Sequence, residues 1–353
     1  MRAVQFGEYG VAPAVVEVSE PLCPAEGVVV AVGATGVCRS DWHAWQGHDP
    51  VDLPHVPGHE LAGRVAEVGN GVTRWQVGER VTVPFVCGCG QCEWCRTGQA
   101  QVCPAQTQPG FTGPGSFAER VVLHAADANL VALPEAIDDV TAASLGCRFA
   151  TAYRAVRVHG RVEPGQWLAV HGCGGVGLSA VLIGVALGAR VIAVDPAPGA
   201  RRRARELGAE VVLEGGGDVA AQIQDLGGAH VSIDALGLPE TAVASVCSLR
   251  RRGRHVQVGL LLGPSATPPL PMDRVVAHEL EIYGAHGMSA ADYPPMLELI
   301  ARGVLDPGRL IGRVIGLDEA GAGGSGGGGR QDTARPDGPR VRAREGQPLP
   351  PFF

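Results

Sequence analysis

The sequence contains no lysine, because all 29 basic residues of the 353-residue chain are arginine. This absence excludes several chemistries. A Schiff base between a lysine amine and a carbonyl substrate cannot form, and the lysine-containing phosphate-binding loop GxxxxGK[ST] is missing. Mechanisms that need a tyrosine–lysine pair are excluded for the same reason.

Positive charge and long apolar runs are also scarce. The net charge of −7 argues against a nucleic-acid-binding surface, which is normally basic. The most apolar stretch, residues 176–189, is too short for a membrane span, and residues 1–10 hold no apolar signal-peptide core. We therefore expect a cytoplasmic protein without a membrane or nucleic-acid partner. In that reducing compartment the ten cysteines favour metal binding over disulfides.

Two patterns of secondary structure divide the chain. Before about residue 140 the sequence is rich in short β-strands bounded by glycine or proline, which indicates an irregular β domain. Afterwards strands alternate with helices, which predicts a parallel sheet covered on both faces. From Gly321 onward apolar periodicity is lost, and glycine, arginine and proline dominate. We expect residues 321–353 to be a disordered tail, either a genuine flexible segment or a frameshift product.

A glycine motif lies between a predicted strand and a predicted helix, in GQWLAVHGCGGVGLSAV. The pattern allows a tight turn, a close approach of the backbone to a pyrophosphate, and close packing of the helix on the sheet. Asp195 ends the next predicted strand, where a carboxylate suits the adenosine ribose and repels a 2′-phosphate. The adjacent run Arg201–Arg203 is interpreted as a solvated helix face. The residues predicted to bind NAD are Gly172, Gly174, Gly175, Val176, Gly177 and Asp195.

Five cysteines stand within residues 87–103, CGCGQCEWCRTGQAQVC. Cys89, Cys92, Cys95 and Cys103 follow the pattern C-x2-C-x2-C-x7-C, and four thiolates on one loop can close a tetrahedral shell around zinc. A closed shell leaves no position for substrate, so this site is predicted to be structural. Cys87 is left over.

A second set of ligand-type residues is spread over the segments CRSDWH, GHE and SLGCRFAT. Cys38, His59 and Cys147 offer two thiolates and an imidazole. Such a set leaves one coordination position open for water or substrate, which is typical of a catalytic zinc site.

Together these motifs resemble the zinc-dependent medium-chain alcohol dehydrogenases of the bacterial NAD-linked type. Alcohol dehydrogenase is the usual example of a catalytic zinc ion bound by two cysteines and one histidine. The resemblance covers residues 1–320 and includes CRSDWH, PGHELAGRVAEVG, GERV, the four-cysteine segment, GCRFAT and GCGGVG in family order. It implies an α/β protein with a GroES-like β domain at 1–147 and a Rossmann domain, a doubly wound parallel sheet, at 148–286. Residues 287–320 would return to the first domain.

The resemblance also implies a role for each residue around the catalytic zinc. Cys38, His59 and Cys147 would bind the metal, and the four-cysteine segment would hold the structural zinc. Glu60 would lie beside the catalytic metal, and Asp41 would orient His59.

Further roles concern substrate and cofactor. Ser40 would contact the alcohol oxygen, and His43 would pass its proton to solvent through the cofactor ribose. Arg39 would contact the pyrophosphate, and Thr151 would lie near the nicotinamide. An apolar substrate pocket would be lined by Phe85, Trp42 and Trp45.

The expected reaction is hydride transfer between a primary or secondary alcohol, or its aldehyde or ketone, and NAD, with two zinc ions per chain. A polyol or a preferred aldehyde stays open as substrate, and so does a nucleotide-binding zinc protein without turnover. Members of the family assemble as dimers or tetramers, so a homotetramer or homodimer is expected. They normally end in an amphipathic helix and a β-strand after LDEA, and residues 321–353 show neither pattern.

Overall fold

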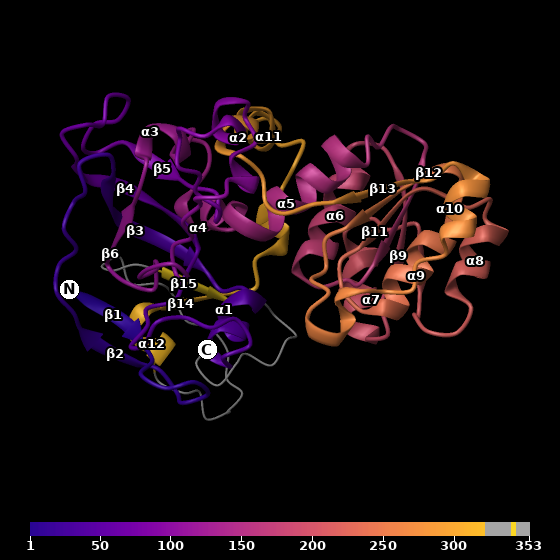
Figure 1. The fold of residues 1–353 in the computed structure, drawn as a ribbon, viewed down its shortest axis with the longest axis horizontal. Coiled ribbons are helices and arrows are strands. Elements are labelled where there is room, and N and C mark those ends of the chain that lie inside the picture. Colours follow the sequence, from indigo (N-terminus) through magenta and orange to yellow (C-terminus); the bar gives the residue numbers. More distant parts are fainter. Residues whose placement is uncertain (322–339, 344–353) are drawn as a thin grey trace. The chain divides into compact units, whose positions relative to one another are not determined.

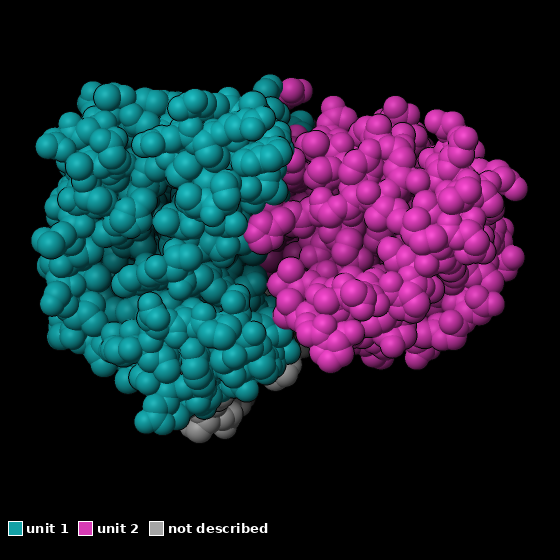
Figure 2. Space-filling view, viewed as in Figure 1, with its two compact units in different colours: residues 1–147, 287–301, 310–353 teal, residues 148–286, 302–309 magenta. Residues whose placement is uncertain are grey.

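The computed structural model of the chain describes residues 1–321 and 340–343. The chain falls into two compact units, which Figure 2 colours separately. The first comprises Met1–Cys147, Gly287–Ala301 and Leu310–Phe353, and the second comprises Arg148–His286 and Arg302–Arg309. The chain therefore leaves the first unit after Cys147 and returns to it at Gly287.

The first unit consists mainly of short strands (Figure 1). One sheet has the order β14-β15-β3-β4-β5-β7, with β6 also paired to β3, and β1 pairs with β2. The strands are β1 (Arg2–Gln5), β2 (Ala14–Glu17), β3 (Val28–Gly36), β4 (Glu60–Val68), β5 (Arg80–Thr82), β6 (Arg120–Leu123), β7 (Val131–Ala132), β14 (Arg313–Gly316) and β15 (Arg340–Ala343).

Strand β3 is the centre of this unit, because its valine-rich sequence suits a strand buried on both sides. Val28, Val29 and Val30 are fully buried. Its antiparallel neighbour β4 pairs with it along its whole length, from Val28 opposite Val68 to Gly36 opposite Glu60. The chain just after β3 and the chain just before β4 consequently lie side by side.

Short helices complete the first unit and carry several of the predicted site residues. Cys147 lies in η2, a π-helical segment, and such segments are frequent at functional sites. The helices are α1 (Arg39–Trp45), α2 (Glu93–Arg96), η1 (Ala100–Val102), α3 (Ala126–Asn129), α4 (Asp139–Ala143), η2 (Leu145–Phe149), η5 (Ala290–Asp292), α11 (Tyr293–Ala301) and α12 (Leu317–Gly321).

The second unit contains a six-stranded sheet in the order β10-β9-β8-β11-β12-β13. Every pairing in it is parallel, which confirms the predicted parallel sheet. The order reverses between β8 and β11, and the carboxyl ends of strands at such a reversal are where open α/β sheets bind ligands. The strands are β8 (Trp167–His171), β9 (Arg190–Val194), β10 (Val211–Leu213), β11 (Ala229–Asp234), β12 (Leu249–Gln257) and β13 (Glu281–Gly284).

Helices connect these strands, and the most apolar stretch of the sequence is one of them. Residues 177–184 of that helix, α6, are all buried, which agrees with the prediction of a buried helix. Within the described ranges no helix is long and apolar enough to cross a membrane. The helices are α5 (Ala150–Tyr153), η3 (Arg154–His159), α6 (Gly175–Ala186), α7 (Pro198–Glu206), α8 (Val219–Asp225), α9 (Pro239–Cys247), η4 (Gly263–Ala266), α10 (Met272–His278) and η6 (Pro307–Leu310).

One expectation about the C-terminal segment is wrong. Residues 340–343 form β15, which pairs antiparallel with β14 and parallel with β3, so the first unit does have a closing strand. The expectation relied on apolar content, whereas a strand needs backbone partners, and both β14 and β3 offer them here. The rest of the prediction of disorder, for residues 322–339 and 344–353, lies outside the described residues.

Candidate metal and cofactor sites

Two groups of side chains in the described part of the chain can hold a metal ion. Each group contains the residues that the sequence predicted as ligands: Cys89, Cys92, Cys95 and Cys103 in one, and Cys38, His59 and Cys147 in the other. Within each group the ligand-type atoms all lie within 4.8 Å of one another. Both groups belong to the first unit.

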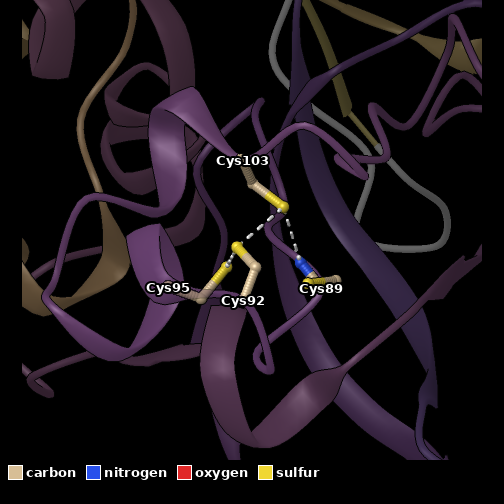
Figure 3. Close-up of side chains that lie close together, drawn as sticks. All are labelled: Cys89, Cys92, Cys95 and Cys103. Carbon is tan, nitrogen blue, oxygen red and sulfur yellow. Dashed lines mark hydrogen bonds between the residues drawn. The ribbon is translucent and has the colours of Figure 1, made fainter.

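The four cysteines meet in one loop region of the first unit, where Figure 3 shows their side chains gathered together. The Sγ atom of Cys92 lies 3.5 Å from that of Cys95 and 3.6 Å from that of Cys103. The backbone N–H of Cys89 donates to Sγ of Cys103 at 3.4 Å. Cys92 precedes α2 and Cys95 lies in it, so a single helical turn brings two ligands to the same side.

The pKa values of two of these thiols, Cys89 and Cys95, differ widely. Backbone N–H groups of Gln91 and Cys92 lower the pKa of Cys89 to about 6. Burial and the neighbouring Cys92 and Cys103 raise the pKa of Cys95 to about 12. Four thiolates therefore do not coexist at neutral pH without a cation to compensate them, and a divalent metal supplies that charge. The cluster fits zinc in a closed, structural shell.

Cys87, the fifth cysteine of the segment, has a different environment. Its side chain is fully buried, and Sγ donates to the carbonyl of Pro84 at 3.5 Å. Burial raises its pKa to about 12, so it stays a neutral thiol in the core. It packs with Val81 and Val83 and belongs to the hydrophobic core.

The second group is organised by Asp41, which is 4% exposed. One carboxylate oxygen accepts from the backbone N–H of Cys38 at 2.8 Å, at the start of α1. The other accepts from the N–H of Gly58 at 3.1 Å and from Nδ1 of His59 at 3.0 Å. Asp41 thus ties the segment after β3 to the segment before β4, and it fixes the ring of His59.

His59 supplies the observation that decides the nature of this group. The side chain is fully buried, and its Nε2 has no hydrogen-bond partner among the described residues. Although burial opposes protonation, the carboxylate of Asp41 and the neighbouring Cys38 raise the pKa of His59 well above its ordinary value, so the ring is a strong base and binds a metal strongly once the metal displaces its Nε2 proton. A ring that donates from Nδ1 to a carboxylate presents its Nε2 lone pair, which is the usual arrangement of a metal-binding histidine. Two thiols beside that lone pair fit zinc.

The structure also shows how Glu60 fits beside this group. Glu60 is fully buried, and a Cβ atom at Gly36 would come within 2.4 Å of its Oε2. A side chain at position 36 would force the carboxylate of Glu60 to move. The backbone carbonyl of Glu60 accepts a hydrogen bond from the hydroxyl of Thr35 at 3.0 Å.

Tyr293 is a positioning residue that the sequence did not reveal. It begins α11, is fully buried, and points its hydroxyl at the carbonyls of Leu145 and Gly146, each 3.4 Å away. These two residues directly precede Cys147. In the sequence Tyr293 belongs to an amphipathic helical pattern, so nothing distinguished it from an ordinary core residue.

The aromatic residues assigned to a pocket occupy different positions. Phe85 has its ring centroid 6.1 Å from that of His59, in an edge-to-face arrangement. Phe111, which the sequence analysis did not single out, is closer at 5.2 Å. Trp42 is half-buried. Trp45 is only 4% exposed, and its indole N–H donates to the carbonyl of Val11 at 2.7 Å.

Helix α1 places the residues assigned to proton transfer and phosphate contact. Sγ of Cys38 lies 3.8 Å from the hydroxyl of Ser40, so this hydroxyl is next to the ligand group. His43 is half-buried in the last turn of the helix. The guanidinium of Arg39 is exposed and lies over the ring of Trp42, 3.6 Å from its centroid.

In the second unit the glycine motif joins β8 to α6, as predicted. Gly172 has a φ of +90°, which only glycine adopts easily. A Cβ atom at Gly177 would come within 1.7 Å of the carbonyl oxygen of Gly172, whereas one at Gly174 would meet nothing within 4 Å. The open side of Gly174, at the N-terminus of the twelve-residue α6, fits the approach of a phosphate group.

Asp195 lies at the carboxyl end of β9 and supports the glycine turn. Its carboxylate accepts from the backbone N–H groups of Cys173 and Ala197, both at 2.8 Å. Arg201 donates to the carbonyls of Asp195 and Pro196, each at 2.8 Å. Arg202 is exposed, whereas Arg201 and Arg203 are half-buried, and Arg203 also donates to the carbonyl of Arg309 at 2.7 Å. The run thus belongs to a surface face of α7, on which Arg201 and Arg203 bind backbone carbonyls as well.

The other residues that the sequence predicts to bind the cofactor in this unit are Thr151, Gly175 and Val176. Thr151 is 6% exposed and lies in α5, a short helix that contacts α6. Gly175 and Val176 open α6. A Cβ atom at Gly175 would come within 2.4 Å of Cδ of Arg148.

Comparison with known proteins places both units in one family. Residues 24–135 match the alcohol dehydrogenase GroES-like domain, and residues 175–302 match the zinc-binding dehydrogenase domain, which confirms the predicted fold class. An alcohol dehydrogenase of Geobacillus stearothermophilus is 35% identical over 313 residues, covering 87% of this chain and 90% of that protein.

Solved structures agree with this assignment. Alcohol dehydrogenase TADH from Thermus sp. ATN1 superposes with a TM-score of 0.81 at 31% identity, covering 88% of this chain and 92% of that one. A zinc-binding dehydrogenase of Sinorhizobium meliloti 1021, solved with NADP bound, has a TM-score of 0.81 at 28% identity and covers 97% and 98% of the two chains. The chain therefore belongs to the zinc-dependent medium-chain alcohol dehydrogenase family and is an oxidoreductase that acts on alcohols.

Proposed function

We propose that the protein transfers hydride between a primary or secondary alcohol and NAD, and that each chain binds one catalytic and one structural zinc ion. The observation that carries this proposal is the buried Nε2 of His59, which has no hydrogen-bond partner among the described residues, in a ring that offers a nitrogen within 4.8 Å of two thiols. A buried polar atom without a partner is costly. A zinc ion held by Cys38, His59 and Cys147 removes that cost.

The zinc ion and the nicotinamide cofactor would each supply one part of the chemistry, and side chains of the protein would orient the metal ligand and handle the proton. When bound, zinc provides a Lewis acid for the alcohol oxygen and the nicotinamide provides the hydride acceptor. Asp41 keeps His59 in the tautomer that presents Nε2, because Nδ1 donates to its carboxylate. Ser40, whose hydroxyl lies 3.8 Å from Sγ of Cys38, would contact the substrate oxygen, and His43, further along α1, would receive the proton.

The preference for NAD rests on Asp195. A carboxylate at the end of the second strand of such a sheet accepts hydrogen bonds from the ribose hydroxyls and repels a 2′-phosphate. In this chain it is also anchored to the glycine turn through Cys173. The side chain is half-buried, which leaves part of it open to a ligand.

Replacing this carboxylate should change cofactor selection. Asp195→Ser is expected to raise KM for NAD by about ten- to a hundredfold, the equivalent of losing one or two charge-assisted hydrogen bonds, and to lower KM for NADP. Arg201 donates to the backbone carbonyl of Asp195 and is therefore a cation available beside this position for a 2′-phosphate. Steady-state kinetics with both cofactors measures the effect.

A second variant isolates the contribution of the arginine. Asp195→Ser combined with Arg201→Ala should lose the gain with NADP while keeping the weaker use of NAD. A thermal melt of both variants checks that the glycine turn is still formed. A wild-type enzyme that already prefers NADP would show that Asp195 does not select the cofactor.

Apolar surface on the second unit supports a homo-oligomer, either a dimer or a tetramer. Strand β13 is at the edge of the six-stranded sheet, and five large exposed apolar side chains lie on it or in the chain between β12 and β13. They are Leu260, Leu262, Met272, Val276 and Ile282. An edge strand beside exposed apolar side chains is a typical place for a second copy to pair. Light scattering at micromolar concentration measures the oligomeric state.

The experiment that tests the proposed function is a substrate panel. The purified protein is incubated with NAD and, separately, with primary alcohols, secondary alcohols and polyols, and NADH is followed by its absorbance. We expect turnover with simple alcohols and the reverse reaction with the matching aldehydes. Turnover confined to polyols, or a strong preference for aldehyde reduction, would favour the alternative substrates. NAD binding without any turnover would favour a nucleotide-binding protein.

A further inference from the structure

Two histidines face each other where helix α1 ends. His43 lies in the last turn of α1 and is half-buried, whereas His48 lies beyond the helix and is exposed. Their Nδ1 atoms are 3.1 Å apart, and their ring centroids are 5.4 Å apart. At that distance one ring donates its Nδ1 proton to the other. The pair therefore connects a half-buried position on α1 to the solvent.

The backbone holds this pair together independently of the side chains. Gly47 has a φ of +73°, and the N–H of His48 donates back to the carbonyl of His43 at 2.9 Å. Many helices end in this way, with a glycine in the left-handed conformation and a backbone hydrogen bond back to the last turn. A Cβ atom at Gly47 would come within 3.1 Å of the ring of Tyr9, so both conformation and space favour glycine. His48 is thereby returned to the side of α1 that carries His43.

Trp42 restrains both rings from one side. Its centroid lies 5.0 Å from that of His43 and 5.3 Å from that of His48, and both contacts are edge-to-face. The guanidinium of Arg39 covers the ring of Trp42. The two imidazoles are therefore held by the backbone, by their mutual hydrogen bond and by an aromatic neighbour.

The charges around His43 favour a ring that gives up a proton readily. Burial lowers its pKa, and the positive groups of Arg39 and His48 lower it further, while Cys38 and Asp49 act in the opposite sense. Its ordinary pKa is near ~6.5. His43 is therefore a weaker base than a free imidazole, which favours transfer of a proton from it to an acceptor within hydrogen-bond reach.

We propose that His48 is a relay residue that passes protons between His43 and bulk water during turnover. The inference rests on the proposed function, since it assumes that His43 receives the substrate proton. His43 gains a proton at Nε2 and gives its Nδ1 proton to Nδ1 of His48, which releases its own Nε2 proton to water. Each ring gains one proton and loses one, so no further reactant is required. Reduction of an aldehyde uses the same path in reverse.

The test compares His48→Asn and His48→Ala with the wild type, with His124→Asn as control. Asn keeps a hydrogen-bonding group near the position of Nδ1 but cannot relay a proton. If His48 had only a structural role, His48→Asn would therefore release protons at the wild-type rate. His124 is another exposed histidine of the first unit. Proton release during one turnover is followed with a pH indicator dye in weak buffer, alongside NADH absorbance.

We expect both His48 variants to slow proton release by about tenfold, less than the hundredfold or more typical of losing the primary acid–base group. Added imidazole should restore the rate, KM should stay unchanged, and His124→Asn should match the wild type. Proton release at the wild-type rate in His48→Ala would overturn the proposal, as would full rescue by His48→Asn. Absence of turnover in the wild type would instead refute the proposed function.

A second readout does not require the working enzyme. NMR of the imidazole nitrogens during a pH titration follows the His43 ring in the wild type and in His48→Ala. In His48→Ala the His43 ring should titrate at higher pH, because the positive charge of His48 is removed. An unchanged titration of His43 in His48→Ala would contradict the pairing on which the proposal depends.

Discussion

Cys38→Ser is expected to remove nearly all turnover while leaving the protein folded. Lewis-acid activation of a bound substrate is worth several kcal/mol, so kcat/KM should fall by at least about a thousandfold. The helix should survive, because Cys38 is the N-cap of α1 and serine is among the residues preferred at that position. Metal analysis should show one zinc ion per chain in the variant and two in the wild type.

A matched substitution controls for the change of sulfur to oxygen. Cys247 ends α9 in the second unit and belongs to neither ligand group. Cys247→Ser should keep both zinc ions and normal turnover. If Cys38→Ser lost no zinc, or kept more than a few per cent of wild-type turnover, Cys38 would not be a ligand of the catalytic metal.

Cys103→Ser should mainly lower thermal stability. Cys103 is 1% exposed, and its sulfur is within 3.6 Å of that of Cys92. Removing one ligand of a structural zinc site forfeits metal-binding energy that is also folding energy. A loss on the order of 3 kcal/mol would lower Tm by about 6–12 °C for a unit of this size. Turnover per folded molecule at a low temperature should change little.

The control for this variant is Cys87→Ala, which removes a buried thiol from the same segment. Because Cys87 donates to Pro84 and not to the cluster, this variant should keep two zinc ions per chain. Its Tm should fall only by the amount expected of a small cavity. Retention of both zinc ions by Cys103→Ser, with an unchanged melt, would show that the four cysteines do not form a structural zinc site.

Sequence patterns were sufficient wherever chemistry restricts the residue type. Thiol and imidazole ligands, and glycines that a backbone or a phosphate must approach, cannot be exchanged for other residues, so Cys89, His59 and Gly172 could be recognised. The parallel sheet was predictable because strand and helix patterns alternate. These features depend on local sequence and on ligand chemistry.

Other features depend on contacts between distant segments, and the sequence did not disclose them. Tyr293 supports the loop before Cys147 from α11, and Phe111 reaches His59 from a separate loop. The pairing of His43 with His48 is local, but it depends on the left-handed φ of Gly47, and nothing in the sequence distinguishes this glycine from the other glycines among the 52. Strand β15 forms because β14 and β3 offer backbone partners to residues 340–343.

The central claim is that the group around His59 holds a catalytic zinc distinct from a structural one. It is tested most directly by measuring zinc per chain, alcohol-dependent NADH formation and Tm on the same wild-type sample during gradual chelation. We expect two zinc ions at the start. The first to leave should abolish turnover with little change in Tm, because its open site is more accessible. Full turnover in protein that holds one zinc ion or none would contradict the account.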